Sequence, residues 1–264
     1  MPNWIYSLPS WFVFVLLVAV LEMASLAGLF LVRRFLLPHI RWHDGVNDAV
    51  SGTVQAIGVF YALTVGLIAV GVWDTYTNTQ DLVSKEAAAI GSLYRDVSGY
   101  AEPPRSELQS LLREYTVAII EKAWPEHKRG RVSDEGTRVL DYFQASLFAY
   151  EPRSEGQKAL HTETLRAFNN LIEARRLRLD QVQSGLSGLM WFVIWIGAAI
   201  SIAVGYFFMI DDPKLHALLV GLMAAFLGLV LFMVVINDRP FTGDTGVTPA
   251  SYQLILDKLI DLPR

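Results

Sequence analysis

Four long apolar stretches occur along the chain, two before and two after a region rich in charged residues. They cover residues 10–32, 49–73, 185–210 and 215–237. Each has the roughly 20 residues that a helix needs to cross the hydrocarbon core of a bilayer. The pattern therefore predicts an all-α membrane protein with four transmembrane helices.

Short polar connectors join these stretches in pairs. The first pair is linked by a segment that begins at Arg33 and ends near Asp48, and the second pair is linked by residues 211–214 alone. Because such short connections leave consecutive helices antiparallel, we expect two helical hairpins, in residues 1–73 and 185–237.

The region between the hairpins, residues 74–184, carries 15 of the 22 Lys and Arg residues and 17 of the 26 Asp and Glu residues. Its apolar positions recur at helical spacing, and no alternating pattern competes with them. We expect a water-exposed helical domain between the second and third transmembrane helices. Its four apolar stripes run over residues 82–97, 108–123, 139–147 and 160–179, the last two behind possible caps at Ser133 and Ser154.

The second span can continue without a break into the first helix of this domain, because no helix-breaking residue lies between Val72 and Ala89. Such a rod of about 45 residues, rising about 1.5 Å per residue, would project well beyond the bilayer. After the last span, residues 238–264 are expected to form a turn and a short amphipathic helix that begins at Pro249. This helix could lie on the membrane surface or against the water-exposed domain.

The composition fits a chain that is solvated largely by lipid, with 53% hydrophobic and 18% charged residues. A net charge of -4 gives no reason to expect a nucleic-acid partner. The absence of cysteine excludes a disulfide framework and a thiolate nucleophile. We find no motif of an enzyme, a cofactor site or a metal centre. The N-terminus lacks the basic residues of a signal peptide, and we expect the first stretch to be retained.

One face of the second span combines hydroxyl and bulky apolar side chains, as a narrow pore that closes by dewetting would require. Lipid or neighbouring helices could equally cover this face. Its members are Thr53, Ile57, Phe60, Thr64 and Leu67. Small residues at four-residue spacing elsewhere predict close packing between helices. The candidates are Gly58, Gly66, Gly197, Ser201, Gly205, Gly221 and Gly228.

Glu22 is the one residue among Asp, Glu, Lys and Arg that lies inside a span. An ionised carboxylate in the bilayer centre costs about 2.5 to 3.5 kcal/mol, and no span offers a cation to pair with it. We therefore expect a neutral carboxyl group, hydrogen-bonded to a hydroxyl such as that of Tyr61, Thr64 or Ser201. The alternatives are proton or cation handling in a wet cavity.

Arg175, Arg176 and Arg178 lie shortly before the third span, where their charge could attract an anion or a lipid headgroup. Pairing with acids of their own or neighbouring helices is the alternative. His39 and His43, followed by Asp44 and Asp48, have spacing that could gather a metal ion, but Pro38 interrupts the segment and we expect no metal site.

Several short motifs resemble, in order, the signature of the bestrophin-like domain family. They include Val72-Trp73-Asp74-Thr75-Tyr76, Lys85-Glu86-Ala87, Ala123-Trp124-Pro125, Arg175-Arg176-Leu177-Arg178-Leu179 and Asp238-Arg239-Pro240-Phe241-Thr242-Gly243. The resemblance covers residues 20 to 255, roughly. At Ala123 the family has an acidic residue, so any role of that acid is absent here.

The resemblance implies a distant relation to bestrophins, which are pentameric anion channels with a pore lined by the second transmembrane helix. The acidic calcium-binding cluster of the animal channels is not found, so calcium control is not implied. The leading hypothesis is an oligomeric ion channel that favours anions and has a helical sensing or gating domain. A membrane-anchored interaction or signalling module without a permeation path is the alternative, and a small transporter that uses Glu22 as a proton site is the third.

We expect the protein to span the bacterial plasma membrane several times, with the lipid bilayer, further copies of the chain and an inorganic ion as its partners. Four spans place both termini and the middle domain on one side. Basic residues near the span ends divide almost evenly between the two sides. The missing signal peptide and the likeness to bestrophins favour a cytoplasmic middle domain.

Overall fold

The computed structural model describes residues 3–39 and 45–261, and within these ranges the chain is helical and contains no strand. Four helices are long and apolar enough to cross a membrane. They are α1 (Ser10–Leu31), α2 (Val46–Val97), α7 (Gly188–Gly205) and α8 (Pro213–Asn237). The remaining α-helices are α3 (Pro104–Ala118), α4 (Trp124–His127), α5 (Glu135–Ala149), α6 (Glu155–Asp180) and α9 (Ala250–Ile255).

Two compact units are distinguished within the chain. Unit 1 contains α1, the first part of α2, α7 and α8, together with the segment Gly243–Thr245. Unit 2 contains the rest of α2, the helices from α3 to α6, and α9. The helix α2 is a single element of 52 residues that contributes to both units, which confirms that the second span continues without a break.

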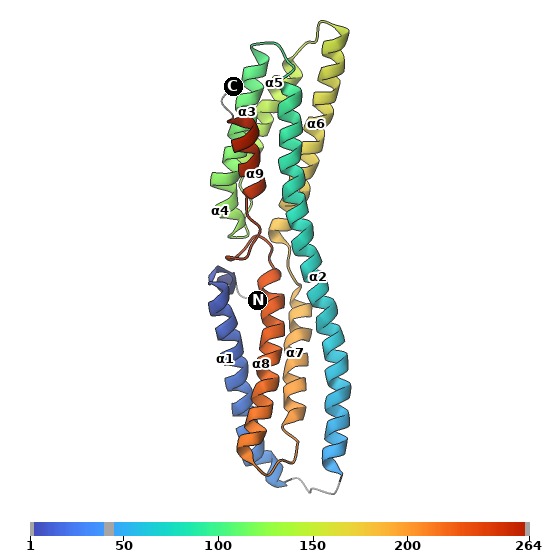
Figure 1. Cartoon of the computed structure of the whole chain (residues 1–264), viewed down its shortest axis with the longest axis vertical. Coiled ribbons are helices and arrows are strands. Elements are labelled where there is room, and N and C mark those ends of the chain that lie inside the picture. The colour runs from blue at the N-terminus through green and yellow to red at the C-terminus, as the bar shows by residue number, and fades with distance from the viewer. Residues whose placement is uncertain (1–2, 40–44, 262–264) are drawn as a thin grey trace. The chain divides into compact units, whose positions relative to one another are not determined.

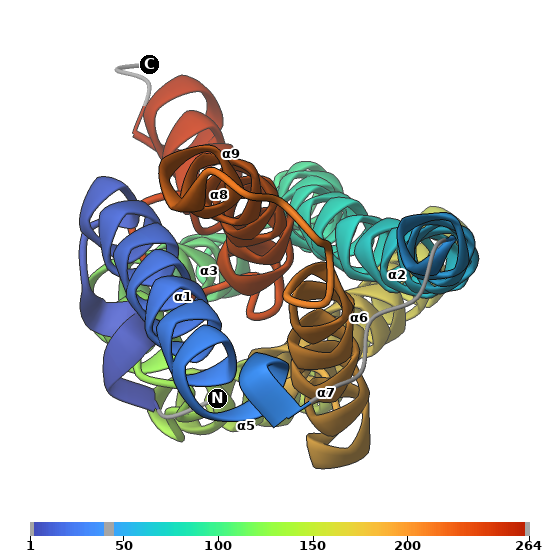
Figure 2. The same ribbon diagram turned by 90° about the horizontal axis from the view of Figure 1, so that it is seen from below.

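In unit 1 the helix α1 packs mainly against α8, and α7 contacts α8 and α2 (Figures 1 and 2). Val65 and Val72 of α2 join a core with Ile194 of α7 and Leu231 of α8. The two helices of the first predicted hairpin are therefore held chiefly by helices of the second. This arrangement allows lipid-exposed helices to bury one apolar stripe each while the opposite stripe stays exposed.

Unit 2 is a helical bundle with an apolar core whose largest fully buried side chains include Ile90, Leu112, Phe143 and Leu171. The periodicity of the sequence matches its helices, because α3, α5 and α6 each bury one stripe. Ser154 caps α6 as expected, and its hydroxyl accepts a hydrogen bond from the backbone N–H of Gln157.

The C-terminal segment belongs to unit 2 from Gly246 onward. Tyr252 of α9 is fully buried in the core of this unit, and Ile255 packs against the same core. Arg113 of α3 pairs with Asp261 at 2.7 Å. The short terminal helix thus takes the second of its two predicted places, against the helical domain.

Candidate functional site

The part of α2 within unit 1 leaves most of its side chains exposed. Phe60 and Leu67 are 72% and 75% exposed, Thr53 and Thr64 are exposed, and Ile57 is half-buried. The hydroxyls of the two threonines donate to backbone carbonyls one turn back, so neither is used to hold another helix. Among the described residues of one chain, the predicted pore face is thus exposed except at Ile57.

The predicted packing residues fall into two groups. A Cβ atom at Gly197 would lie 2.5 Å from the ring of Tyr61, one at Gly228 would lie 3.0 Å from Val18, and one at Gly205 would lie 3.2 Å from Met223. Ser201 donates to the carbonyl of Gly197 at 2.8 Å. The three glycines lie where helices approach closely, whereas the hydrogen bond of Ser201 stays within α7.

The other group faces open space. Gly58 and Gly66 of α2, and Gly221 of α8, have no atom within 4 Å of an added Cβ. Among the described residues of one chain, these glycines make no close contact with another helix. They stay candidates for contacts with lipid or with a second copy.

Glu22 is half-buried on α1, and its carboxyl group has no hydrogen bond to the described residues. The three hydroxyls expected as partners donate to backbone carbonyls instead. Tyr61 donates to Ile194, Thr64 to Phe60, and Ser201 to Gly197. A role of Glu22 in helix association or in proton transfer stays a prediction.

A second candidate site lies in unit 2, where a charged pair is enclosed by the bundle. Glu86 of α2 and Arg178 of α6 are 0% and 1% exposed. The Nε atom of Arg178 donates to one carboxylate oxygen of Glu86, and its Nη2 atom donates to the other at 3.3 Å. Tyr115 of α3 adds a hydrogen bond to Glu86 at 2.6 Å. The carboxylate is thus compensated by two neighbouring helices, as a buried charge requires.

The remaining guanidinium nitrogen of Arg178 donates to Nδ1 of His127 at 3.2 Å. Because an arginine can only donate, Nδ1 accepts and the proton of the neutral ring is on Nε2. Burial, followed by the charges of Arg178 and Arg175, lowers the pKa of His127 to about 3. His127 is therefore a neutral hydrogen-bond acceptor for Arg178 at any physiological pH.

Aromatic rings cover the other sides of the guanidinium. Its carbon lies 5.9 Å from the ring centre of Trp124 and 6.0 Å from that of Tyr252, within the range of cation–π attraction. Burial opposes the charge of Arg178, but Glu86 outweighs it and raises the pKa of the guanidinium. Burial also raises the pKa of Tyr252, and the nearby Glu86 adds to this against the opposing charge of Arg178.

Two polar atoms in this cluster lack a hydrogen-bond partner among the described residues. They are Nε2 of His127 and the hydroxyl oxygen of Tyr252, both fully buried. Glu86 lies close enough to act on the Tyr252 hydroxyl electrostatically, yet the two do not meet hydrogen-bond geometry. Unsatisfied buried groups are costly, so these two atoms reduce the net stability that the cluster contributes.

The three arginines that the sequence placed before the third span have different surroundings. Arg178 is buried and pairs with Glu86, as the alternative prediction of pairing with an acid of a neighbouring helix has it. Because its charge is enclosed, Arg178 is not placed to attract an anion from solution. Arg175 is half-buried and donates to Thr137 of α5 at 2.8 Å, whereas Arg176 is exposed.

The motif residues that carried the family resemblance converge on this cluster. Glu86, Trp124 and Arg178 come from three of the motifs, and Phe241 of a fourth packs against Trp124 with ring centres 5.5 Å apart. The π-helical segment Ile119–Ala123 leads directly into Trp124. Segments that are far apart in sequence thus build one structural feature.

The histidine pair considered for a metal lies partly outside the described residues, which do not include His43 and Asp44. His39 has its Nδ1 atom 2.8 Å from the carbonyl oxygen of Phe35. Among the described residues, no three His, Asp or Glu side chains are grouped as a metal site would need.

Comparison with known proteins gives a consistent result. The model of the Bestrophin-like domain family matches residues 18–252. No curated protein matches the chain. The fold is similar to a single-substitution variant of a bacterial bestrophin homologue from Klebsiella pneumoniae, with a TM-score of 0.71 and 10% sequence identity. That alignment covers 94% of this chain and 98% of the other.

A second structure of a bacterial bestrophin homologue from Klebsiella pneumoniae has a TM-score of 0.71 and 11% identity, over 94% of this chain and 97% of that chain. At such low identity the likeness concerns the fold.

Proposed function

The chain belongs to the Bestrophin-like domain family, and on this premise we propose that it forms a homo-oligomeric ion channel in which α2 lines the pore. The pore face comprises Thr53, Ile57, Phe60, Thr64 and Leu67. If the channel conducts, anions are favoured, as the family resemblance implies. The membrane is the plasma membrane of a bacterium.

The main support is the exposed face of α2 in unit 1. Residues 49–73 bury only Val65 and Val72 among the helices of one chain. The helix also exposes glycines where an added Cβ would meet no described atom within 4 Å, such as Gly58 and Gly66. A face that alternates hydroxyls with large apolar groups suits a neck whose wetting controls conduction.

In the proposed topology, two helical hairpins lie in the lipid and residues 74–184 lie in water on the cytoplasmic side, together with both termini. The continuous helix α2 then carries movement of the water-exposed domain to the pore. The pairing of Glu86 with Arg178 supports this role, because it fixes the water-exposed part of α2 to α6 and, through Tyr115, to α3.

The test combines an oligomer measurement with ion flux. Mass measurement in detergent is expected to give a closed ring of several copies, and purified protein in liposomes is expected to conduct chloride. Replacing Phe60 and Thr64 by Ala should change conductance or selectivity, whereas Leu222→Ala on the exposed side of α8 should not. Unchanged flux in the Phe60/Thr64 variant would remove these residues from the pore.

A monomer that passes no ions would instead support the membrane-anchored interaction module. The variant Glu22→Gln distinguishes the transporter hypothesis from the channel. If Glu22 is a neutral packing residue, this variant folds and leaves flux unchanged at each pH. A flux that loses only its pH dependence would assign proton transfer to Glu22.

A further inference from the structure

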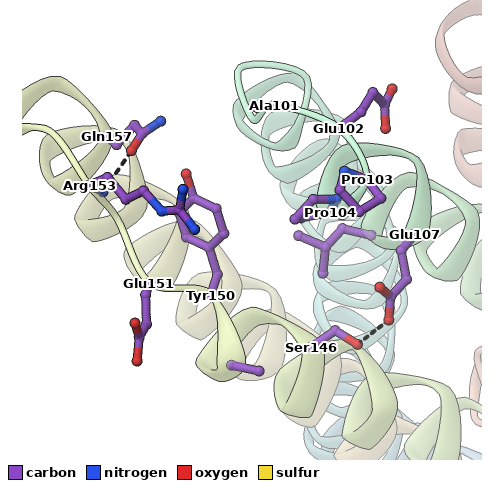
Figure 3. A pocket seen from close by; sticks show the side chains of 12 residues that line it. Ala101, Glu102, Pro103, Pro104, Glu107, Ser146, Tyr150, Glu151, Arg153 and Gln157 are labelled. Atoms are coloured by element: carbon purple, nitrogen blue, oxygen red, sulfur yellow. Dashed lines mark hydrogen bonds between the residues drawn. The ribbon is translucent and has the colours of Figure 1, made fainter.

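A cleft of about 620 Å³ opens in unit 2 between the turn before α3 and the loop that joins α5 to α6 (Figure 3). Its volume lies in the usual range for small-molecule sites, about 300 to 1,000 Å³. The buried side chain of Leu108 contributes to its apolar lining, with Pro103 and Pro104 on one wall and Tyr150 on the other. Neither the family motifs nor the proposed pore involves this cleft.

One wall of the cleft carries a cation without an anionic partner. Arg153 forms no ion pair with a described carboxylate, and its side chain extends from the α5–α6 loop into the cleft (Figure 3). The loop beneath it is held in place, because the backbone N–H of Arg153 donates to Gln157 at 2.7 Å and that of Gln157 donates to Ser154 at 3.2 Å.

The opposite wall carries a carboxylate without a cation. Glu107 of α3 accepts a hydrogen bond from Ser146 at 2.6 Å and pairs with no described Lys or Arg. Two further acids line the cleft but contribute less charge to it. Glu102 is compensated by Arg105 at 2.6 Å, and the Glu151 side chain points away from the opposite wall (Figure 3).

The aromatic wall is held by its own cluster. The rings of Tyr150 and Tyr100 are 4.6 Å apart, and the hydroxyl of Tyr100 lies 2.8 Å from Nδ1 of His161. Tyr150 therefore offers a fixed surface for an apolar group or for the face-on approach of an ammonium group.

From this arrangement we propose that the cleft binds a small zwitterion, an amino acid or a short peptide. The ligand carboxylate pairs with Arg153, the ammonium group pairs with Glu107, and its side chain lies between Tyr150 and the two prolines. An inorganic anion does not fit as well, because Glu107 repels it and it leaves most of the volume unfilled. The proposal is independent of ion conduction.

The test measures binding to the full chain in detergent micelles. The probes are the natural L-amino acids and their N-alanyl dipeptides, followed by ligand-observed NMR and by the shift of the thermal unfolding midpoint. At least one probe is expected to bind. Its N-acetylated form and its carboxamide form should each bind about tenfold more weakly, because each loses one charge-assisted interaction.

Two variants assign the charges to residues. Arg153→Gln should abolish the preference for the free carboxylate over the carboxamide, and Glu107→Gln should abolish the preference for the free amine over the acetylated form. Arg166→Gln is the matched control, because Arg166 is an exposed arginine of α6 that pairs with Glu163 outside the cleft.

Three results would overturn the proposal: no probe binds the unaltered chain, the blocked derivatives bind as tightly as the free zwitterion, or the two cleft variants keep both preferences. The side chains of Glu107, Arg153 and Arg166 are exposed, so the variants should fold. Melting curves close to that of the unaltered chain verify this. Binding is read without ion flux, so a chain that binds the zwitterion but conducts nothing would refute the channel and leave the cleft intact.

Discussion

The two parts of α2 expose and bury opposite kinds of side chain. In unit 1 the helix exposes Phe60 and Leu67, whereas in unit 2 it buries Glu86 completely. Lipid makes the first arrangement favourable, since apolar side chains need no protein cover there. The buried carboxylate has no such solvent around it, so it depends on Arg178 and Tyr115. One helix thus exposes apolar side chains in one part and buries a charged side chain in another. A charged side chain that is buried marks a position where a specific partner is needed.

The largest expected effect comes from removing the partner of Glu86. Arg178→Met leaves the carboxylate buried beside Tyr115 alone, which should lower the free energy of unfolding of unit 2 by about 3–5 kcal/mol. Thermal unfolding of the full chain in detergent, followed by circular dichroism, measures this loss.

Two further variants sharpen this result. Arg138→Met removes an exposed partner of Glu135, 3.8 Å away, and should cost less than about 1 kcal/mol. The double variant Glu86→Leu/Arg178→Met removes both charges and should recover much of the loss. If Arg178→Met were no more costly than Arg138→Met, the buried pair would not hold the helices together.

In unit 1 the matching test concerns close packing. Gly197→Ala would place a methyl group 2.5 Å from the ring of Tyr61, which must move together with its hydrogen bond to the carbonyl of Ile194. Such overpacking should cost about 1–3 kcal/mol. Gly221→Ala is the control, since no atom lies within 4 Å of its added Cβ. Equal unfolding midpoints for the two variants in detergent would contradict this packing of α2 on α7.

His127 makes the stability of unit 2 dependent on pH. Its pKa is about 3 in the folded state, lowered by burial and by Arg178, against 6.5 for an unperturbed side chain. Between these values the unfolded chain binds more protons, so stability falls as the pH is lowered. The loss is about 1.4 kcal/mol per pH unit, or about 2 kcal/mol from pH 6.5 to pH 5.

His127→Gln keeps an acceptor for Arg178 and removes the titration. Chemical unfolding at a series of pH values should therefore show a shallower decline in this variant. His161→Gln is a useful comparison, because burial lowers the pKa of His161 as well, but this residue lies at the Tyr100 cluster. If the free energy of unfolding of His127→Gln fell with pH as steeply as that of the unaltered chain, the pKa of His127 would be the same in the folded and unfolded states.

Much of the fold could be predicted because the length of each apolar run decides where a membrane span lies. A run of about 20 apolar residues specifies a membrane span wherever it occurs. The continuity of α2 follows from the lack of a helix breaker after Val72, and the start of α6 follows from Ser154. The packing partners of the helices were harder to predict. α1 and α8 are in contact although they lie near opposite ends of the sequence, and no local pattern encodes that choice.

Pairing of Arg178 with an acid of a neighbouring helix was one of the predicted alternatives, but Glu86 as its partner and the burial of the pair were missed for the same reason. Glu86 and Arg178 are 92 positions apart, and their pairing depends on how α2 and α6 meet. A signal was nevertheless present. Glu86 lies four residues after Leu82 and four before Ile90, and Arg178 lies seven after Leu171, so both charges stand on apolar helical stripes. Tyr115, His127 and Tyr252 join them only through the tertiary fold.

The smallest expected effects compare helix caps in the two units. Ser154 caps α6 and Ser187 caps α7, and each hydroxyl accepts a backbone hydrogen bond, at 3.2 Å and 3.3 Å respectively. Ser154→Ala and Ser187→Ala should each cost about 1 kcal/mol, because water can replace part of the lost bond at an exposed helix end. Unfolding midpoints of the two variants, measured in the same detergent, test this equality. A cost of several kcal/mol for Ser187→Ala alone would mean that the start of α7 is shielded from water, since an unpaired N–H in hydrocarbon has no other partner.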